Sequence, residues 1–264
     1  MLLRRTVWLG AKSNQTMTSI IHYYQHLPDE FKPWVESIWM VENIDTKNKP
    51  VVVLPDGRID IHFFSIPGEP FQTSLAGIDT QASYTEINAG SRVYGICFYP
   101  LAVEYLLQTP LSKLINGRAN LERGFWDITE QDTDNFERFK HKIFARLTQL
   151  DITNVDPRKL KMFSALHQSQ GHISVTELAE HCHWSSRQIN RYFNQWLGLS
   201  VKAYTSILRF RASFSTLKTG KLFPESDFSD QSHFIKEIKK YSGHTPKQLY
   251  KNQDDRFIQL SILK

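Results

Sequence analysis

The sequence predicts a multidomain protein: an N-terminal α+β domain over residues 17–150, followed by an all-α domain over residues 157–264 with two helix-turn-helix-like units, the second truncated. The chain of 264 residues exceeds the usual single-domain size of about 100–200 residues. After Asp132 the spacing of apolar residues changes from that of strands to that of helices. The polar, proline-bearing segment DITNVDP, residues 151–157, separates the two patterns.

The stretch VVVLPDGRIDIHFF, residues 51–64, is the strongest strand signal of the first domain. A Pro-Asp-Gly turn joins a continuous apolar run to an alternating one. This pattern predicts a β-hairpin whose buried face carries Ile59, Ile61 and Phe63. A second strand is predicted in SRVYGICFYP, 91–100, followed by a short helix in LAVEYLLQTP, 101–110.

The other face of the alternating strand carries Asp60, His62 and Phe64. These side chains are either the lining of a ligand pocket or the solvent side of the sheet, and the pattern leaves both open. Asp56, Asp60 and His62 could form an acid/base set. However, an Asp at position 56 is what a Pro-Asp-Gly turn favours, so its presence needs no catalytic role. Cys97 lies in an apolar strand without a neighbouring base and is expected in the core.

An apolar stripe at helical spacing ends the first domain. It consists of Phe136, Phe139, Ile143, Phe144, Leu147 and Leu150. The stripe predicts a helix packed on its own domain. A coiled-coil seam needs sustained heptads, and this segment has barely two, so homodimer formation stays open.

The second domain contains the same sequence pattern twice. HWSSRQINRYFNQWLGLSVKAY, from residue 183, and FSDQSHFIKEIKKYSGHTPKQLY, from residue 228, superpose when shifted by the 45 residues between Gly198 and Gly243, with apolar residues on apolar and basic on basic. In the first copy, TELAEHC and the turn HWS precede a helix over 185–197 that begins at Ser185, which indicates a helix-turn-helix unit. Gly198 is expected to end this helix and Ser200 to begin the next.

The exposed side of the helix over 185–197 holds no carboxylate. It presents Arg187, Gln188, Arg191, Asn194 and Gln195, with Asn190 at its margin. Such side chains pair with guanine and adenine edges, and a helix fits the major groove of DNA. In the second copy the helix over 230–241 offers Gln231, Ser232, His233, Lys236, Lys239 and Lys240. His233 either contacts DNA or belongs to the buried side of its helix.

Charge is segregated between the two domains. Residues 157–264 carry 17 Lys and Arg against 8 Asp and Glu, whereas residues 1–156 carry 15 against 19. The net charge of +5 is therefore concentrated in the helical domain. This distribution favours double-stranded DNA as a partner of that domain alone.

The second domain resembles the AraC/XylS family of bacterial transcription regulators. The resemblance covers residues 160–252 and rests on TELAEHC, SSRQINRYF, LRFRA and DQSHFIKEIKKYSGHTP. It implies sequence-specific DNA binding, with base contacts from Arg187, Asn190 and Arg191 in the first unit and from Gln231, Ser232 and Lys236 in the second. PWVESIW, LPDGRIDIHF and GICFYPLAVEYLL resemble the uncharacterised sensor-type domain that precedes some such modules, which implies a small-molecule effector or a protein partner.

The second unit departs from the family pattern. KLFPESD, residues 221–227, stands where the supporting helix should be, and Pro224 is incompatible with a helix interior. A loop is therefore expected to replace that helix.

Other functions have less support in the sequence. The alternative is a ligand-binding or repair enzyme fused to a DNA-targeting helix-turn-helix module, and a third possibility is an interaction module with non-specific nucleic-acid contacts. No catalytic residue or cofactor is expected. No metal is expected either, because the three adjacent residues of HCH, 181–183, point in different directions on a helix and no second Cys/His cluster supplies the remaining ligands. Without a leader or membrane segment of adequate length, and with Met17 as a second candidate start, a cytoplasmic protein without membrane contact is expected.

Overall fold

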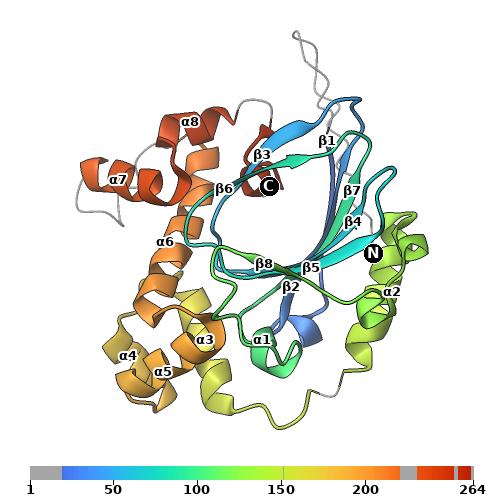
Figure 1. Ribbon diagram of the computed structural model, residues 1–264. Coiled ribbons are helices and arrows are strands. Elements are labelled where there is room, and N and C mark those ends of the chain that lie inside the picture. The colour runs from blue at the N-terminus through green and yellow to red at the C-terminus, as the bar shows by residue number, and fades with distance from the viewer. Residues whose placement is uncertain (1–19, 151, 221–230, 253–254, 263–264) are drawn as a thin grey trace.

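Two antiparallel sheets face one another in the N-terminal part of the protein (Figure 1). The computed structural model describes residues 20–150, 152–220, 231–252 and 255–262. The larger sheet has the order β1-β2-β7-β4-β5-β8 and the smaller one pairs β3 with β6. The strands are β1 Ile20–His26, β2 Val35–Asn43, β3 Lys49–Val53, β4 Ile59–Ser65, β5 Gln72–Ala76, β6 Ser83–Ile87, β7 Arg92–Phe98 and β8 Arg118–Asn120.

The larger sheet packs one face against a helix and turns the other to the smaller sheet. Ile59, Ile61 and Phe63 of β4 are fully buried, as the alternation predicts. They meet α2, Phe136–Thr148, whose Phe139 ring lies 5.3 Å from that of Phe63. The predicted apolar stripe of α2 therefore packs on its own domain. The opposite, more polar face of β4 is turned towards β3 and β6.

The predicted hairpin over residues 51–64 is wrong. Val51–Val53 lie in β3, which pairs with β6, whereas β4 pairs with β5 and β7. The segment between them carries the chain from one sheet to the other instead of turning it back. A Pro-Asp-Gly turn fixes a local bend, but the partner of each strand is chosen by long-range packing.

The C-terminal part is helical (Figure 1). Short 3-10 turns over Asp29–Phe31, Phe125–Asp127 and Glu130–Thr133 and helix α1, Ala102–Tyr105, belong to the N-terminal part. The later helices are α3 Pro157–Gln168, α4 Val175–Cys182, α5 Ser186–Leu197, α6 Val201–Lys218, α7 Gln231–Ser242, α8 Pro246–Lys251 and α9 Ile258–Ile262. The N-terminal β-rich domain followed by a helical domain confirms the predicted fold class. In the described ranges no helix is long and apolar enough to span a membrane.

Two sequence-based expectations fall outside the described residues. The first is the loop expected at KLFPESD, 221–227, and the second concerns the segment around Met17. The division between the domains lies where α2 ends at Thr148 and α3 begins at Pro157, and the boundaries 150 and 157 stay a prediction.

The two parts of the chain share a continuous core. Tyr204 of α6 is fully buried, and its hydroxyl donates to the Gly57 carbonyl at 3.3 Å. The Leu111 amide donates to the Trp196 carbonyl at the end of α5. The Ala82 amide, just before β6, donates to the Tyr241 carbonyl of α7 at 2.8 Å. The N-terminal domain therefore contacts both helix-turn-helix units.

The C-terminal segment returns to the N-terminal domain. Phe257 forms a parallel bridge with Val52, and the Val52 amide donates to the Arg256 carbonyl at 2.7 Å. The Gln259 side chain exchanges two hydrogen bonds with the Leu54 backbone, each 2.8 Å. This segment adds to the edge of β3, although it follows the second unit in sequence. Residues 256–262 thus add a further contact between the C-terminal part of the chain and the N-terminal domain.

Phe257→Ala is expected to lower the free energy of unfolding by about 3–5 kcal/mol, because it empties a site that a fully buried aromatic ring fills. Urea unfolding of the full chain followed by circular dichroism measures this change. Ile44→Ala is the control, since Ile44 is 54% exposed and its loss should change stability by less than about 0.5 kcal/mol. Equal effects of the two substitutions would contradict the anchoring role of residues 256–262.

Candidate nucleic-acid interface and inter-domain cavity

Helices α4 and α5 form the first helix-turn-helix unit, and local capping defines both. Ser174 begins α4 in a capping box with Glu177, and Ser185 begins α5 in a capping box with Gln188. His183 occupies the tight turn between them with a left-handed backbone, φ 54°. Gly198, φ 77°, ends α5, as its position after the helix predicts.

Helix α5 turns a polar face to solvent. Ile189, Phe193 and Leu197 are fully buried, and Tyr192 packs beside them. The exposed side chains include Arg187, Gln188, Arg191, Asn194 and Gln195, whereas Asn190 is half-buried. The predicted reading face is therefore accessible at the surface of the helical domain.

The polar side chains of this face differ in whether they already form hydrogen bonds within the protein. Gln188 accepts from the Ser185 amide at 2.8 Å, so its side chain is engaged in the cap. Asn190 donates to the Ser186 carbonyl and accepts from the Val201 amide, which ties α5 to the start of α6. Arg187 and Arg191 make no ion pair or hydrogen bond with other described residues. Their guanidinium groups are thus available for an external partner.

Helix α7 supplies a second exposed polar face. Phe234, Ile238 and Tyr241 hold it against the domain. Its exposed residues include Gln231, Ser232, His233, Lys236, Lys239 and Lys240. Lys240 lies 3.7 Å from the Glu237 carboxylate, so this face carries one acidic neighbour that α5 lacks. The exposure of His233 removes the alternative that it faces the core.

Comparison with known families decides the type of this domain. Residues 178–252 match the model of a helix-turn-helix domain, and residues 25–120 match a domain of unknown function, DUF6597. The chain carries an AraC-type helix-turn-helix domain. This confirms the resemblance inferred from the repeated sequence. An AraC-type helix-turn-helix domain places the protein among DNA-binding transcription regulators.

Two solved structures are similar to the chain over most of its length. A variant of ToxT from Vibrio cholerae in its apo form is 13% identical with a TM-score of 0.39, and another ToxT structure is 14% identical with a TM-score of 0.38. In each case 88% of this chain and 97% of ToxT are covered. No curated protein sequence matches the chain significantly.

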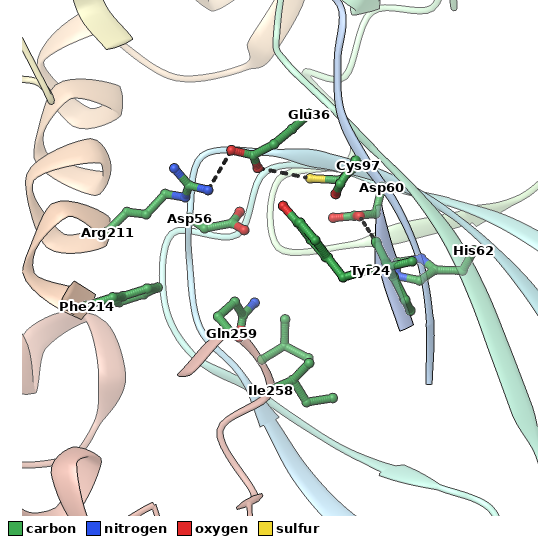
Figure 2. A pocket seen from close by; sticks show the side chains of 13 residues that line it. Tyr24, Glu36, Asp56, Asp60, His62, Cys97, Arg211, Phe214, Ile258 and Gln259 are labelled. Carbon is green, nitrogen blue, oxygen red and sulfur yellow. Dashed lines mark hydrogen bonds and ion pairs between the residues drawn. The ribbon is translucent and has the colours of Figure 1, made fainter. Parts of the chain in front are cut away.

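A cavity of about 110 Å³ lies where the AraC-type domain meets the two sheets (Figure 2). Residues from the larger sheet, the smaller sheet, α6 and α9 line it. They are Tyr24, Glu36, Ser37, Trp39, Val53, Asp56, Asp60, His62, Cys97, Arg211, Phe214, Ile258 and Gln259. The helical domain thus forms part of the cavity wall.

An ion-pair network joins the two domains at this wall. Arg58 donates two hydrogen bonds to Glu36, at 3.0 and 3.2 Å, and Arg211 of α6 donates a third at 2.7 Å. Burial by itself raises the pKa of Glu36, but the two guanidiniums outweigh it and hold that pKa well below its usual range. Glu36 is therefore charged, and its charge is shared between the domains.

The polar face of β4 lines the cavity, with one exception. Asp60 accepts from the Trp39 indole at 3.1 Å, and burial, with the nearby Asp56 carboxylate, raises its pKa to about 7. Burial lowers the pKa of His62 to about 3, so the ring is neutral, and its Nδ1 has no hydrogen-bond partner. Phe64 does not line the cavity, but stacks on the His62 ring at 5.8 Å. The polar face of β4, which the sequence left open between pocket and solvent, thus faces a partly open cavity.

Several lining residues had no assigned role in the sequence. Glu36 is a lone carboxylate in the apolar stretch VESIWMV, which is the one local signal that could have singled it out. Arg211, 175 positions later, carries no such signal. Cys97 is buried as expected, but it also lines the cavity, with its thiol 3.6 Å from Glu36. Burial raises the pKa of this thiol, which disfavours reactivity.

The HCH segment is structural in the described part of the chain. Cys182 is fully buried, and its thiol donates to the Leu178 carbonyl at 2.9 Å. Within residues 20–150, 152–220, 231–252 and 255–262, no group of three His, Cys, Asp or Glu side chains is arranged to hold a metal ion.

Arg191→Ala is expected to weaken binding to the preferred DNA sequence by about 1–3 kcal/mol and to relax preference at one base position, because arginine binds guanine through two hydrogen bonds. The preferred sequence is selected from a random pool, and affinities are compared by fluorescence anisotropy. Arg191→Lys keeps the charge and should restore affinity for random DNA but not the base preference. Equal weakening of specific and random DNA would reduce Arg191 to a phosphate contact.

Asp60→Asn is expected to raise the free energy of unfolding by about 2–4 kcal/mol at pH 8. The native carboxyl keeps its proton up to a pKa of about 7, whereas the unfolded one ionises near pH 4, so wild-type stability falls as pH rises through this window. Asparagine carries no charge and still accepts from Trp39. Urea unfolding between pH 4 and pH 8 measures the difference, which should vanish near pH 4.

Asp29→Asn is the matched control, since that carboxylate is exposed and pairs with Lys32. A lower stability of Asp60→Asn than of the wild type at pH 8 would show that the Asp60 charge is compensated.

Proposed function

We propose that the protein is an effector-controlled, sequence-specific DNA-binding regulator in which a small molecule in the inter-domain cavity alters the presentation of α5 and α7 to DNA. The observation that carries this proposal is the composition of the cavity wall. It joins the two sheets to Arg211 and Phe214 of α6 and to Ile258 and Gln259 of α9. Occupancy of the cavity therefore acts on both domains at once.

Helix α6 is the element through which the cavity reaches the DNA-binding surface. It begins three residues after the Gly198 that ends α5 and leads towards α7. Its Tyr204 ring packs on Phe193 of α5 at 5.5 Å, and its Phe210 ring packs on Tyr241 of α7 at 5.2 Å. A shift of α6 at Arg211 would thus move the supports of both exposed helices.

Within this function, the two exposed faces have different roles. Arg187 and Arg191 of α5 read base edges, while Gln188 caps the start of the helix, Asn190 ties it to α6, and Asn194 adds a polar contact beside them. On α7, Gln231, Ser232 and Lys236 add base contacts, while His233, Lys239 and Lys240 contact phosphates. The greater freedom of the arginines on α5 favours the first helix as the main source of sequence preference.

Glu36→Gln tests the proposal, because it removes the charge that joins the domains yet lies on neither exposed helix face. It should change affinity for the selected DNA at least about fivefold, since a shared two-state element couples distant sites by about 1 kcal/mol or more. Higher DNA affinity of the variant would mean that the domain arrangement held by Glu36 binds DNA more weakly than the alternative arrangement. Lower DNA affinity would mean that it binds DNA more tightly.

Fluorescence anisotropy supplies the affinity, and circular dichroism establishes that each variant is folded. Glu69→Gln, an exposed carboxylate of the same domain, is the control. If Glu36→Gln and Arg211→Ala both fold and bind DNA with wild-type affinity, the proposal fails.

A further inference from the structure

The cavity holds more negative than positive charge. Its lining contains three carboxylates, Glu36, Asp56 and Asp60, but the single guanidinium of Arg211. Arg58, behind Glu36, is the second cation of this group. Farther out, Arg118 acts on Asp60 and also on a fourth carboxylate, Asp79.

Counting these groups leaves one carboxylate without a matching cation. Arg58 and Arg211 both bond directly to Glu36 and act on Asp56 only through space, so the least compensated charge is that of the pair Asp56 and Asp60. An unpaired carboxylate in a buried site costs several kcal/mol unless it takes up a proton or gains a cation.

The cavity also contains polar side chains that lack partners. Ser37 is 1% exposed, and its hydroxyl is buried beside the Tyr24 phenol without a well-formed hydrogen bond. The Nδ1 atom of His62, two residues from Asp60, is also unpartnered. Buried polar atoms of this kind are usually satisfied by a neighbour or by a bound molecule. Together with the carboxylates, they give one side of the cavity several hydrogen-bond acceptors.

The remaining walls are aromatic and are held in place. The Trp39 ring lies directly over Gly95 of β7, where even a Cβ atom would meet it at 2.1 Å. The absence of that atom lets the indole lie against the strand and donate to Asp60. Phe214, which is 1% exposed, and Tyr24 complete the aromatic lining. Aromatic faces beside carboxylates are the surroundings that favour organic cations.

We propose that the cavity binds a small protonated organic amine, whose ammonium group is held by Asp56 and Asp60 and whose carbon skeleton packs on Trp39, Tyr24 and Phe214. The proposal rests on the proposed function, in which the cavity is the effector site. The volume of about 110 Å³ suits a compact molecule, since engineered apolar cavities of about 150 Å³ bind benzene.

Other ligand charges fit the cavity less well. An anion would need Arg211, whose guanidinium is already bound to Glu36 at 2.7 Å, and would add a charge of the sign present in excess. A neutral molecule would leave the unmatched carboxylate uncompensated. An amine neutralises this charge and fills the acceptors on the same side of the cavity.

The same placement links the ligand to α6. Asp56 and Glu36 both attract Arg211, as the direction of their mutual electrostatic effects indicates. An ammonium group beside Asp56 competes with Arg211 for that attraction. Binding of the amine therefore weakens one of the contacts that hold α6 against the N-terminal domain.

The test compares matched compounds of three charges on the full chain at pH 8 and constant ionic strength. The amines are n-butylamine and tyramine, the neutral partners are 1-butanol and 4-ethylphenol, and the anions are butyrate and 4-hydroxyphenylacetate. At about 10 mM, at least one amine should raise the thermal midpoint by about 2 °C or more, and its neutral and anionic partners should not.

Variants locate the effect, with affinity measured by calorimetry. Asp60→Asn should weaken the amine at least about tenfold, as should Asp56→Asn, because each removes a charge-assisted hydrogen bond. Glu69→Gln, an exposed carboxylate, should not change its affinity. The inference is overturned if no amine raises the midpoint, if the neutral or anionic partners act as strongly, or if both aspartate variants bind normally.

The experiments distinguish failure of the amine proposal from failure of the proposed function. If amines do not bind but Glu36→Gln alters DNA affinity, the inter-domain coupling stands and only the ligand class is lost. If amines bind but Glu36→Gln and Arg211→Ala leave DNA affinity unchanged, the cavity is an amine site that does not control DNA binding.

Discussion

The buried carboxylate of Glu36 is the constraint on which the arrangement of the two domains depends. Its side chain is only 10% exposed, so it requires compensation from within the protein. Arg58 from the N-terminal domain and Arg211 from α6 supply that compensation together. Separating the two domains would therefore leave Glu36 with Arg58 alone and remove the hydrogen bond that ties it to α6.

We expect such a network to determine how the two domains are positioned relative to one another more than it raises the free energy of unfolding. The Coulombic gain of a buried ion pair is largely offset by the loss of hydration of its members. What the geometry of Glu36 does impose is a position for α6, because a hydrogen bond of 2.7 Å tolerates little displacement. Helix α6 in turn packs on both α5 and α7, so one carboxylate in β2 influences the placement of two helices far from it in sequence.

The same strands that carry this network separate apolar from polar side chains. On β4, alternate residues pack against α2, and the residues between them face the cavity, because successive side chains of a strand point to opposite sides. The smaller sheet and residues 256–262 then cover much of the polar face and limit its contact with solvent. This enclosure explains why Asp60 has a raised pKa and His62 a lowered one although neither has an unusual sequence context.

The sequence by itself determined the features that depend on near neighbours. Ser185 and Ser200 begin their helices as expected, and Ile59, Ile61 and Phe63 are buried as expected. Helix caps and strand alternation act over a few residues, so their signals are complete within a short stretch. The repeated pattern around Gly198 and Gly243 identified the DNA-binding domain for the same reason.

Only the tertiary structure decided which segments meet. The choice between β3–β4 and β3–β6 pairing, the enclosure of Asp60 and His62, and the contact of Glu36 with Arg211 all join segments distant in sequence. Each depends on the total free energy of burying entire faces of sheets and helices against one another, and no local residue pattern specifies that total. The inter-domain cavity is therefore a property of the folded chain, whereas the exposed polar faces of α5 and α7 could be predicted from the sequence alone.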